Sequence, residues 1–270
     1  MTADERISLI RVKVERARKH IRDLELEIRA FLDSNPYVIE TKPNHQRNAL
    51  IYYLASVRDT PLTVAAITGD VLCNLRAALD HLAYHLVLVN GGTPIKQTYF
   101  PIFDDAAKYI DGKSRKVAGM RPEAIKAIDA IEPYKGGNNV LWQLHSLNNI
   151  DKHRILITVG SAVSGIKYHN ENRRHLIKAI HANAGFTLTD AEADARNFFS
   201  RPEFRVCPLE ASSVLLVDPF KREVNDKVQF AFEIAFNESK IAEGEPLLET
   251  LQQTAELVDN IVLAFKPLLA

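Results

Sequence analysis

Residues 71–85, with the sequence VLCNLRAALDHLAYH, predict the middle of a long helix that is buried along one side. Leucines recur here at steps of three and four residues, the spacing that places side chains on one face of an α-helix. They are Leu72, Leu75, Leu79, Leu82 and Leu86. Four ionisable side chains, Arg76, Asp80, His81 and His85, interrupt the apolar stretch. Because an unpaired buried charge is costly, these groups are expected to be paired or to serve a site.

A second polar cluster, HSLNNIDKHR, occupies residues 145–154. His145, Asn149 and His153 step by four residues, which predicts that they share a helix face. Cationic groups at the end of that helix favour the negative end of its dipole. We expect the two clusters to face each other and to form one site. The predicted catalytic residues are Arg76, Asp80, His81, Asp151, His153 and Arg154, and the predicted substrate-binding residues are His145, Asn149 and Lys152.

The rest of the chain predicts further long helices and several short strands. Helices with a heptad-like apolar seam are expected at 3–33 and 246–269, and the helix containing residues 71–85 is expected to end at Asn90-Gly-Gly. Shorter helices are expected at 106–117, 122–131 and from 138 or 139 to 151. Strands are expected at 37–41, 50–57, 155–159, 166–168, 184–188, 213–217 and 228–236, the last with apolar residues at every second position.

These elements predict one α+β domain over residues 1–270, in which a bundle of long helices packs with an antiparallel β-sheet. The seam at 3–33 is expected to pack within its own chain rather than in a dimeric coiled coil.

Composition limits the classes of partner. Lys+Arg and Asp+Glu both number 34, so the net charge is zero and a nucleic acid would need a local basic patch. The two cysteines, Cys73 and Cys207, favour a reducing cytosol over a disulfide framework. There is no apolar leader and no run of 18 apolar residues, so the protein is expected to be cytoplasmic, without a membrane partner.

Three segments of the chain resemble a family of bacterial proteins of unknown function. They are LRAALDHLAY at residues 75–84, FPIF at 100–103 and LNNIDKHR at 147–154, in this order. The likeness spans roughly residues 70–160. It implies that the two polar clusters belong to one site, and it implies no activity.

The spacing Arg76-x4-His81 also resembles the core motif of the HEPN ribonuclease superfamily. The resemblance implies a metal-independent ribonuclease, with RNA as its partner and no cofactor. His81 would move the proton of the attacking ribose hydroxyl and Arg76 would hold the phosphate. Side chains five residues apart point about 140° apart around a helix, so they converge only with help from another helix or subunit. This interpretation therefore predicts a homodimer.

Two other functions follow from the same residues. His81, His85, His145 and His153 could supply a metal site in the bundle, and the protein would then be a metal-binding hydrolase. Alternatively the polar cluster is structural, and the protein binds a ligand or another protein without catalysis. The helix that contains Trp142 and the aromatic residues Tyr99, Phe100 and Phe103 would then shape a ligand pocket or a dimer face.

Overall fold

The computed structural model describes residues 1–46, 48–153, 157–169, 178, 181–182, 185–189, 192, 207–219 and 227–270. The fold is α+β, as the sequence predicts. The described chain divides into two compact units, one helical and one made mainly of strands. The prediction of a single domain over residues 1–270 concerns how these units fold together, and it stays a prediction.

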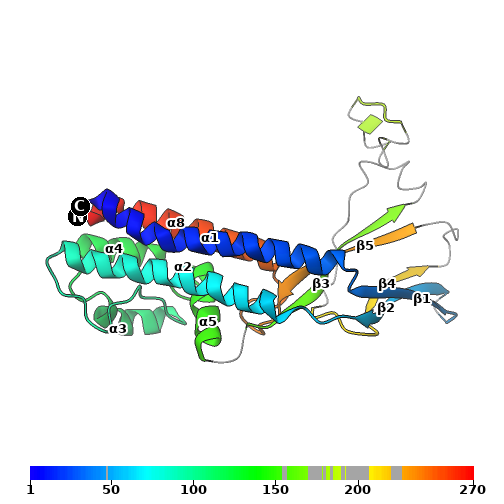
Figure 1. Ribbon diagram of the computed structural model, residues 1–270, viewed down its shortest axis with the longest axis horizontal. Helices are drawn as coiled ribbons and strands as arrows, with labels where there is room; N and C mark the ends of the chain where they lie inside the picture. Colours follow the sequence, from blue (N-terminus) through cyan, green and yellow to red (C-terminus); the bar gives the residue numbers. More distant parts are fainter. Residues whose placement is uncertain are drawn as a thin grey trace. The chain divides into compact units, whose positions relative to one another are not determined.

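The helical unit comprises residues 1–29, 61–158 and 238–270. Its long elements are α1 (Ala3–Asp33, continuing beyond the unit), α2 (Leu62–Val89) and α8 (Leu247–Ala264), which run alongside one another in Figure 1. The shorter elements are α3 (Ala106–Lys116), α4 (Pro122–Ile131), α5 (Asn139–His153) and the 3-10 turn η1 (Lys266–Leu269).

Helix α2 lies at the centre of this unit and packs against α5, α8 and η1. The leucine stripe that the sequence predicts is fully buried, from Leu72 to Leu86. The α1 seam is also buried within the chain, from Ile7 through Ile28. Burying both stripes removes a continuous apolar surface from water, which is the main stabilising contribution in such a bundle.

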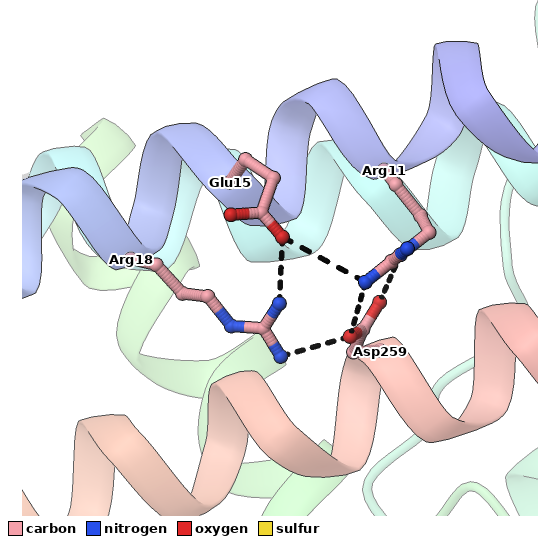
Figure 2. A network of polar contacts seen from close by, with 4 residues as sticks. All are labelled: Arg11, Glu15, Arg18 and Asp259. Carbon is pink, nitrogen blue, oxygen red and sulfur yellow. Dashed lines mark hydrogen bonds and ion pairs between the residues drawn. The ribbon is translucent and has the colours of Figure 1, made fainter.

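One ion network joins α1 to α8 (Figure 2). Asp259 of α8 accepts hydrogen bonds from Arg11 Nε at 2.7 Å and Arg18 Nη2 at 2.8 Å, and Glu15 accepts one from Arg18 Nη1 at 2.7 Å. Burial by itself would raise the pKa of Asp259, but the hydrogen bonds from Arg11 and Arg18 outweigh it and lower the pKa. The network therefore holds a nearly buried carboxylate in its charged form.

The strand unit comprises residues 30–60 and 159–237. Its described residues form two antiparallel sheets. The first has the order β1 (Tyr37–Asn44), β2 (Ala49–Val57), β4 (Val214–Pro219), and the second pairs β3 (Val159–His169) with β5 (Lys227–Phe236).

A shared apolar core holds the two sheets together. Leu54 of the first sheet clusters with Val163 and Ile166 of the second. The Tyr37 and Phe232 rings lie 4.0 Å apart between centroids, and Tyr37 donates a hydrogen bond to Ser161 Oγ at 2.7 Å. The described strands thus form two packed sheets, where the sequence predicts one.

The predicted helices agree with the structure within about two residues, apart from the last one, whose end is the separate turn η1. Two strand predictions need correction. Residues 185–188 form no strand, and residue 184 lies outside the described residues. In the segment 155–159 only Val159 begins a strand, while residues 155 and 156 lie outside the described residues. Short apolar runs carry weak information about strand ends because pairing partners decide them.

Candidate functional site

Arg76 and Asp80 form a buried ion pair on α2, as their four-residue spacing allows. Arg76 Nη2 lies 2.8 Å from Asp80 Oδ1. The same nitrogen donates to the carbonyl oxygen of Phe100 at 2.8 Å, and Asp80 Oδ1 accepts from the Phe100 N–H at 3.1 Å. The pair therefore holds both backbone polar groups of Phe100, and with them the loop between α2 and α3.

Burial dominates the electrostatics of this pair. It lowers the pKa of Arg76 and raises the pKa of Asp80, and for Asp80 the nearby Arg76 charge and the Phe100 N–H partly oppose the shift. The guanidinium stays protonated because its ordinary pKa lies far above neutral pH. Arg76 is 4% exposed, so its charge is screened weakly and acts on neighbouring side chains.

One face of α5 supplies the opposite wall. Trp142, His145, Asn149 and Lys152 follow one another at steps of three and four residues. His145 Nε2 and Asn149 Nδ2 lie 3.2 Å apart. Burial lowers the pKa of His145 to about 4, and the charges of Arg76, Lys116 and Lys152 add to this effect while Asp104 opposes it. His145 is therefore neutral at neutral pH and lies where positive charge is in excess.

Lys116, the last residue of α3, completes the cluster. Burial lowers the pKa of its ammonium group, as does the charge of Arg76, while Asp80 raises it. Its Nζ lies 4.5 Å from the centre of the Phe103 ring. The nearby Asp104 forms an ion pair with Lys108 at 2.8 Å, so its charge is largely compensated.

Three buried nitrogen atoms around this cluster have no hydrogen-bond partner among the described residues: Arg76 Nη1, Trp142 Nε1 and His145 Nδ1. Trp142 Nε1 lies near the Asp104 carboxylate and helps to lower the pKa of Asp104, after the larger effect of Lys108, although the contact does not have hydrogen-bond geometry. A buried polar group without a partner costs about 1–3 kcal/mol. The cluster therefore has unused donors next to unbalanced positive charge.

A groove reaches the edge of the cluster. Its volume is about 760 Å³, and Lys116 lines both the groove and the cluster. The other lining residues are Gln97, Tyr99, Phe103, Lys108, Asp111, Gly112 and Arg115, which include two further cations and one acid. A small anion from solvent could therefore approach the cluster through a surface with an excess of positive charge.

The structure does not bring His81 to this cluster. His81 is exposed, and its charge acts on His85. His85 is buried and lies 3.3 Å, through Nδ1, from Arg6 Nη1 of α1. Burial, Arg6 and His81 together lower the pKa of His85. Arg76 and His81 thus face different surroundings on α2, as expected from the angle between them.

Asp151 lies beside α2 at a point of close helix contact. A Cβ atom added to Gly69 would collide with the Asp151 carboxylate, so only glycine at this position leaves room for Asp151. Burial raises the pKa of Asp151, as does the charge of Asp70, while Lys152 lowers it. Of the second cluster, His145 therefore lies near Arg76 and Lys152 near Asp80, whereas Asp151 lies beside Gly69 and Asp70, away from Arg76. The side chain of His153 and all of Arg154 lie outside the described residues.

No three His, Cys, Asp or Glu side chains in the described part of the chain come close enough to share a metal ion. Within the alternative metal set, His81 and His85 influence each other, His145 lies in the Arg76 cluster, and the His153 side chain is outside the description.

Sequence reasoning missed Lys116, whereas it named Trp142 and Phe100 only for the non-catalytic alternative, as residues that shape a ligand pocket or a dimer face. Phe100 also belongs to the FPIF segment between the two polar clusters. Nothing in the sequence distinguishes Lys116 from the other basic residues near the end of α3.

Comparison of the chain with models of protein families, with curated proteins and with solved structures finds no match. The two family resemblances therefore stay predictions.

Proposed function

We propose that the helical unit is a binding module for a small oxyanion such as phosphate, held by Arg76, Lys116, Trp142 and His145. The observation that carries this proposal is the set of three buried nitrogen atoms without partners among the described residues, beside an excess of positive charge. This is the ligand-binding function among those that the sequence leaves open. In it, Asp80 and Phe100 have a structural role.

An oxyanion would meet the chemical needs of each group. Arg76 keeps Nη1 for it, because Nη2 is occupied by Asp80 and Phe100. Trp142 Nε1–H is a donor only, and neutral His145 donates from Nδ1 in one of its tautomers. Lys116 adds a positive charge at the open edge. Hydrogen bonds to a charged acceptor contribute about 1.5–3 kcal/mol each, which offsets the cost of removing these groups from water.

Trp142 is the only tryptophan in the chain, so its fluorescence reports this site directly. Titration of the purified protein with inorganic phosphate at constant ionic strength should give a saturable change in Trp142 emission. Lys116→Gln should weaken binding at least about tenfold, since it removes one of the closest charges. Lys126→Gln, an exposed position on α4, is the matched control and should bind normally. Absence of saturation, or equal affinities for the two variants, would show that the cluster holds water only.

A second readout is the titration of His145 by NMR. Without phosphate His145 should titrate near its lowered pKa of about 4. A bound anion supplies the negative charge that the site lacks and should raise this pKa toward its ordinary value of about 6.5. An unchanged His145 pKa at a phosphate concentration that saturates the fluorescence would place the anion elsewhere.

The alternative function is the HEPN-like ribonuclease that the sequence predicts, and a different assay of the same protein tests it. It requires exposed His81 of one copy to work with an Arg76 that is largely occupied by Asp80 and Phe100. The assay is RNA cleavage with and without EDTA, beside Arg76→Ala and His81→Ala. EDTA-resistant cleavage that leaves cyclic phosphate ends, lost in both variants, would establish the ribonuclease. Phosphate binding without RNA cleavage would support the binding module and contradict the ribonuclease.

A further inference from the structure

The outward face of α2 carries an apolar seam that nothing in the helical unit covers among the described residues. The seam consists of eight positions separated by steps of four or three residues: Leu62, Ala66, Asp70, Cys73, Ala77, His81, Tyr84 and Leu88. At about 100° per residue these positions lie within an arc of about 100°. They form one continuous stripe along the whole helix.

This stripe differs from the usual outer face of a bundle helix, which is polar. Leu62 is 76% exposed and Tyr84 is 48% exposed. Ala66 and Cys73 are exposed, and Ala77 and Leu88 are partly exposed. Only Asp70 and His81 carry ionisable groups other than a thiol or phenol. A contiguous exposed apolar stripe of this kind marks an interaction surface.

The apolar character of both faces also makes α2 the one described helix that is long and apolar enough, by length and composition, to cross a membrane. However, 56% of the apolar window of α2 is buried within the protein, and the inner face packs against α5 and α8. A bilayer would have to remove these partners, so the stripe fits a protein partner instead.

We propose that two copies of this chain pair through the outward face of α2, with the two helices antiparallel and centred near residue 75. In this register Leu62 lies opposite Leu88 of the second copy, and Ala66 lies opposite Tyr84. Asp70 lies opposite His81, and Cys73 opposite Ala77. Each contact occurs twice because the pairing is symmetric. The proposal is independent of the anion site.

Charge complementarity supports the antiparallel direction. Negative charge is concentrated around Asp70, since Asp151 lies close to it and Lys152 partly offsets this charge. Around His81 the neighbours are His85 and Arg6, which are neutral or positive. Antiparallel pairing brings each acidic end to a basic end, whereas parallel pairing would place like ends together.

Size complementarity supports the same register. Cys73 and Ala77 are small and lie at the centre of the stripe, so the helix backbones can approach closely there. Tyr84, the largest residue of the stripe, meets Ala66, the smallest type. Because a single helix seam is a small interface, the expected dimer is weak, with a dissociation constant in the micromolar range.

The first test uses the central contact. In the Ala77→Cys variant, the introduced thiol lies opposite Cys73 of the second copy, so mild oxidation should give disulfide-linked dimers in high yield. The matched control is Ala77→Cys combined with Cys73→Ala. It keeps the introduced thiol, but the two thiols of a dimer are then offset by four residues, or about 6 Å along the helix, and should link poorly. Equal yields from the two variants would overturn the register.

The second test uses the charged contact, with association measured by sedimentation across the micromolar range. Asp70→His should weaken the dimer at least about tenfold, because each Asp70–His81 contact then loses its carboxylate. The swap Asp70→His with His81→Asp restores an acid opposite a histidine and should recover dimerisation. Lys116→Gln should leave it unchanged. A wild-type protein that stays monomeric, or a swap that fails to recover the single variant, would overturn the proposal.

Discussion

Arg76 is the residue on which the local structure depends most. One of its terminal nitrogens serves both Asp80 and the Phe100 carbonyl, and the other has no partner among the described residues. The first arrangement fixes the loop between α2 and α3. The second nitrogen, Nη1, is a buried donor that remains available to a ligand. One side chain therefore has both a structural role and a proposed binding role.

Replacing Arg76 by alanine should lower the free energy of unfolding by about 3 kcal/mol, because the change leaves the carboxylate of Asp80, which is only 21% exposed, without its partner. Urea unfolding followed by circular dichroism measures this loss. The control is the double variant Arg76→Ala with Asp80→Ala, which should lose less than the sum of the two single changes. Strict additivity would show that the ion pair contributes no coupling.

At the scale of elements, α1 and α8 are held in register by Asp259, while α2 has apolar residues on both its inner and its outer faces. The buried apolar faces of these helices account for their packing into a bundle. The Asp259 network is more specific, since one carboxylate accepts hydrogen bonds from arginines two turns apart on α1 (Figure 2). It selects one sliding position of α1 against α8.

Asp259→Asn should therefore destabilise the protein by about 1–2 kcal/mol near neutral pH, a range reduced because the arginines are partly exposed. The folded protein lowers the pKa of Asp259, so its contribution is present above the unfolded value of about 3.9. It is lost as pH falls through the folded pKa. The difference between wild type and variant, from urea unfolding at several pH values, should hold above pH about 5 and shrink below about 4.

Glu15→Gln is the control for this prediction. Glu15 also binds Arg18 but its side chain is 56% exposed, so the change should stay within about 0.5 kcal/mol. A difference between wild type and Asp259→Asn that grows as the solution is acidified would contradict the assignment.

At the scale of the whole molecule, the chain passes between the two compact units four times, once near the end of α1. Neither unit is one continuous segment. Each unit therefore affects the stability of the other. When one unit unfolds, the ends of the segments that form the other unit are no longer held in place, which raises the entropy cost of keeping it folded. This coupling supports the prediction of one cooperative domain.

Leu54→Ala tests this cooperativity. Leu54 is fully buried in the strand unit, so its truncation should cost about 2–5 kcal/mol. Trp142 lies in the helical unit, and if the protein unfolds as one domain, the midpoint of its fluorescence transition should fall together with the circular dichroism midpoint. Val38→Ala, at a side chain that is 48% exposed, is the control and should leave both unchanged. A fluorescence midpoint that is unchanged in Leu54→Ala would show that the two units unfold as independent domains.

Local periodicity by itself determined most of the secondary structure and the buried stripes of α1, α2 and α8. It is also consistent with the Arg76–Asp80 pair, because residues four apart on a helix lie on the same face. The spacing already separates His81 from Arg76 around the helix, but local pattern could not predict that Arg76 would be buried and His81 exposed, since both residues interrupt the same apolar run.

Only the tertiary structure decided which polar groups meet. Lys116, His145 and Phe100 come from separate elements, and their approach to Arg76 depends on how α3, α5 and a loop pack around α2. The division of the strands into two sheets was likewise decided by pairing between distant segments. The physical reason is the same in both cases: a spacing along one helix is set within a few residues, whereas contacts between elements arise from packing across the whole chain.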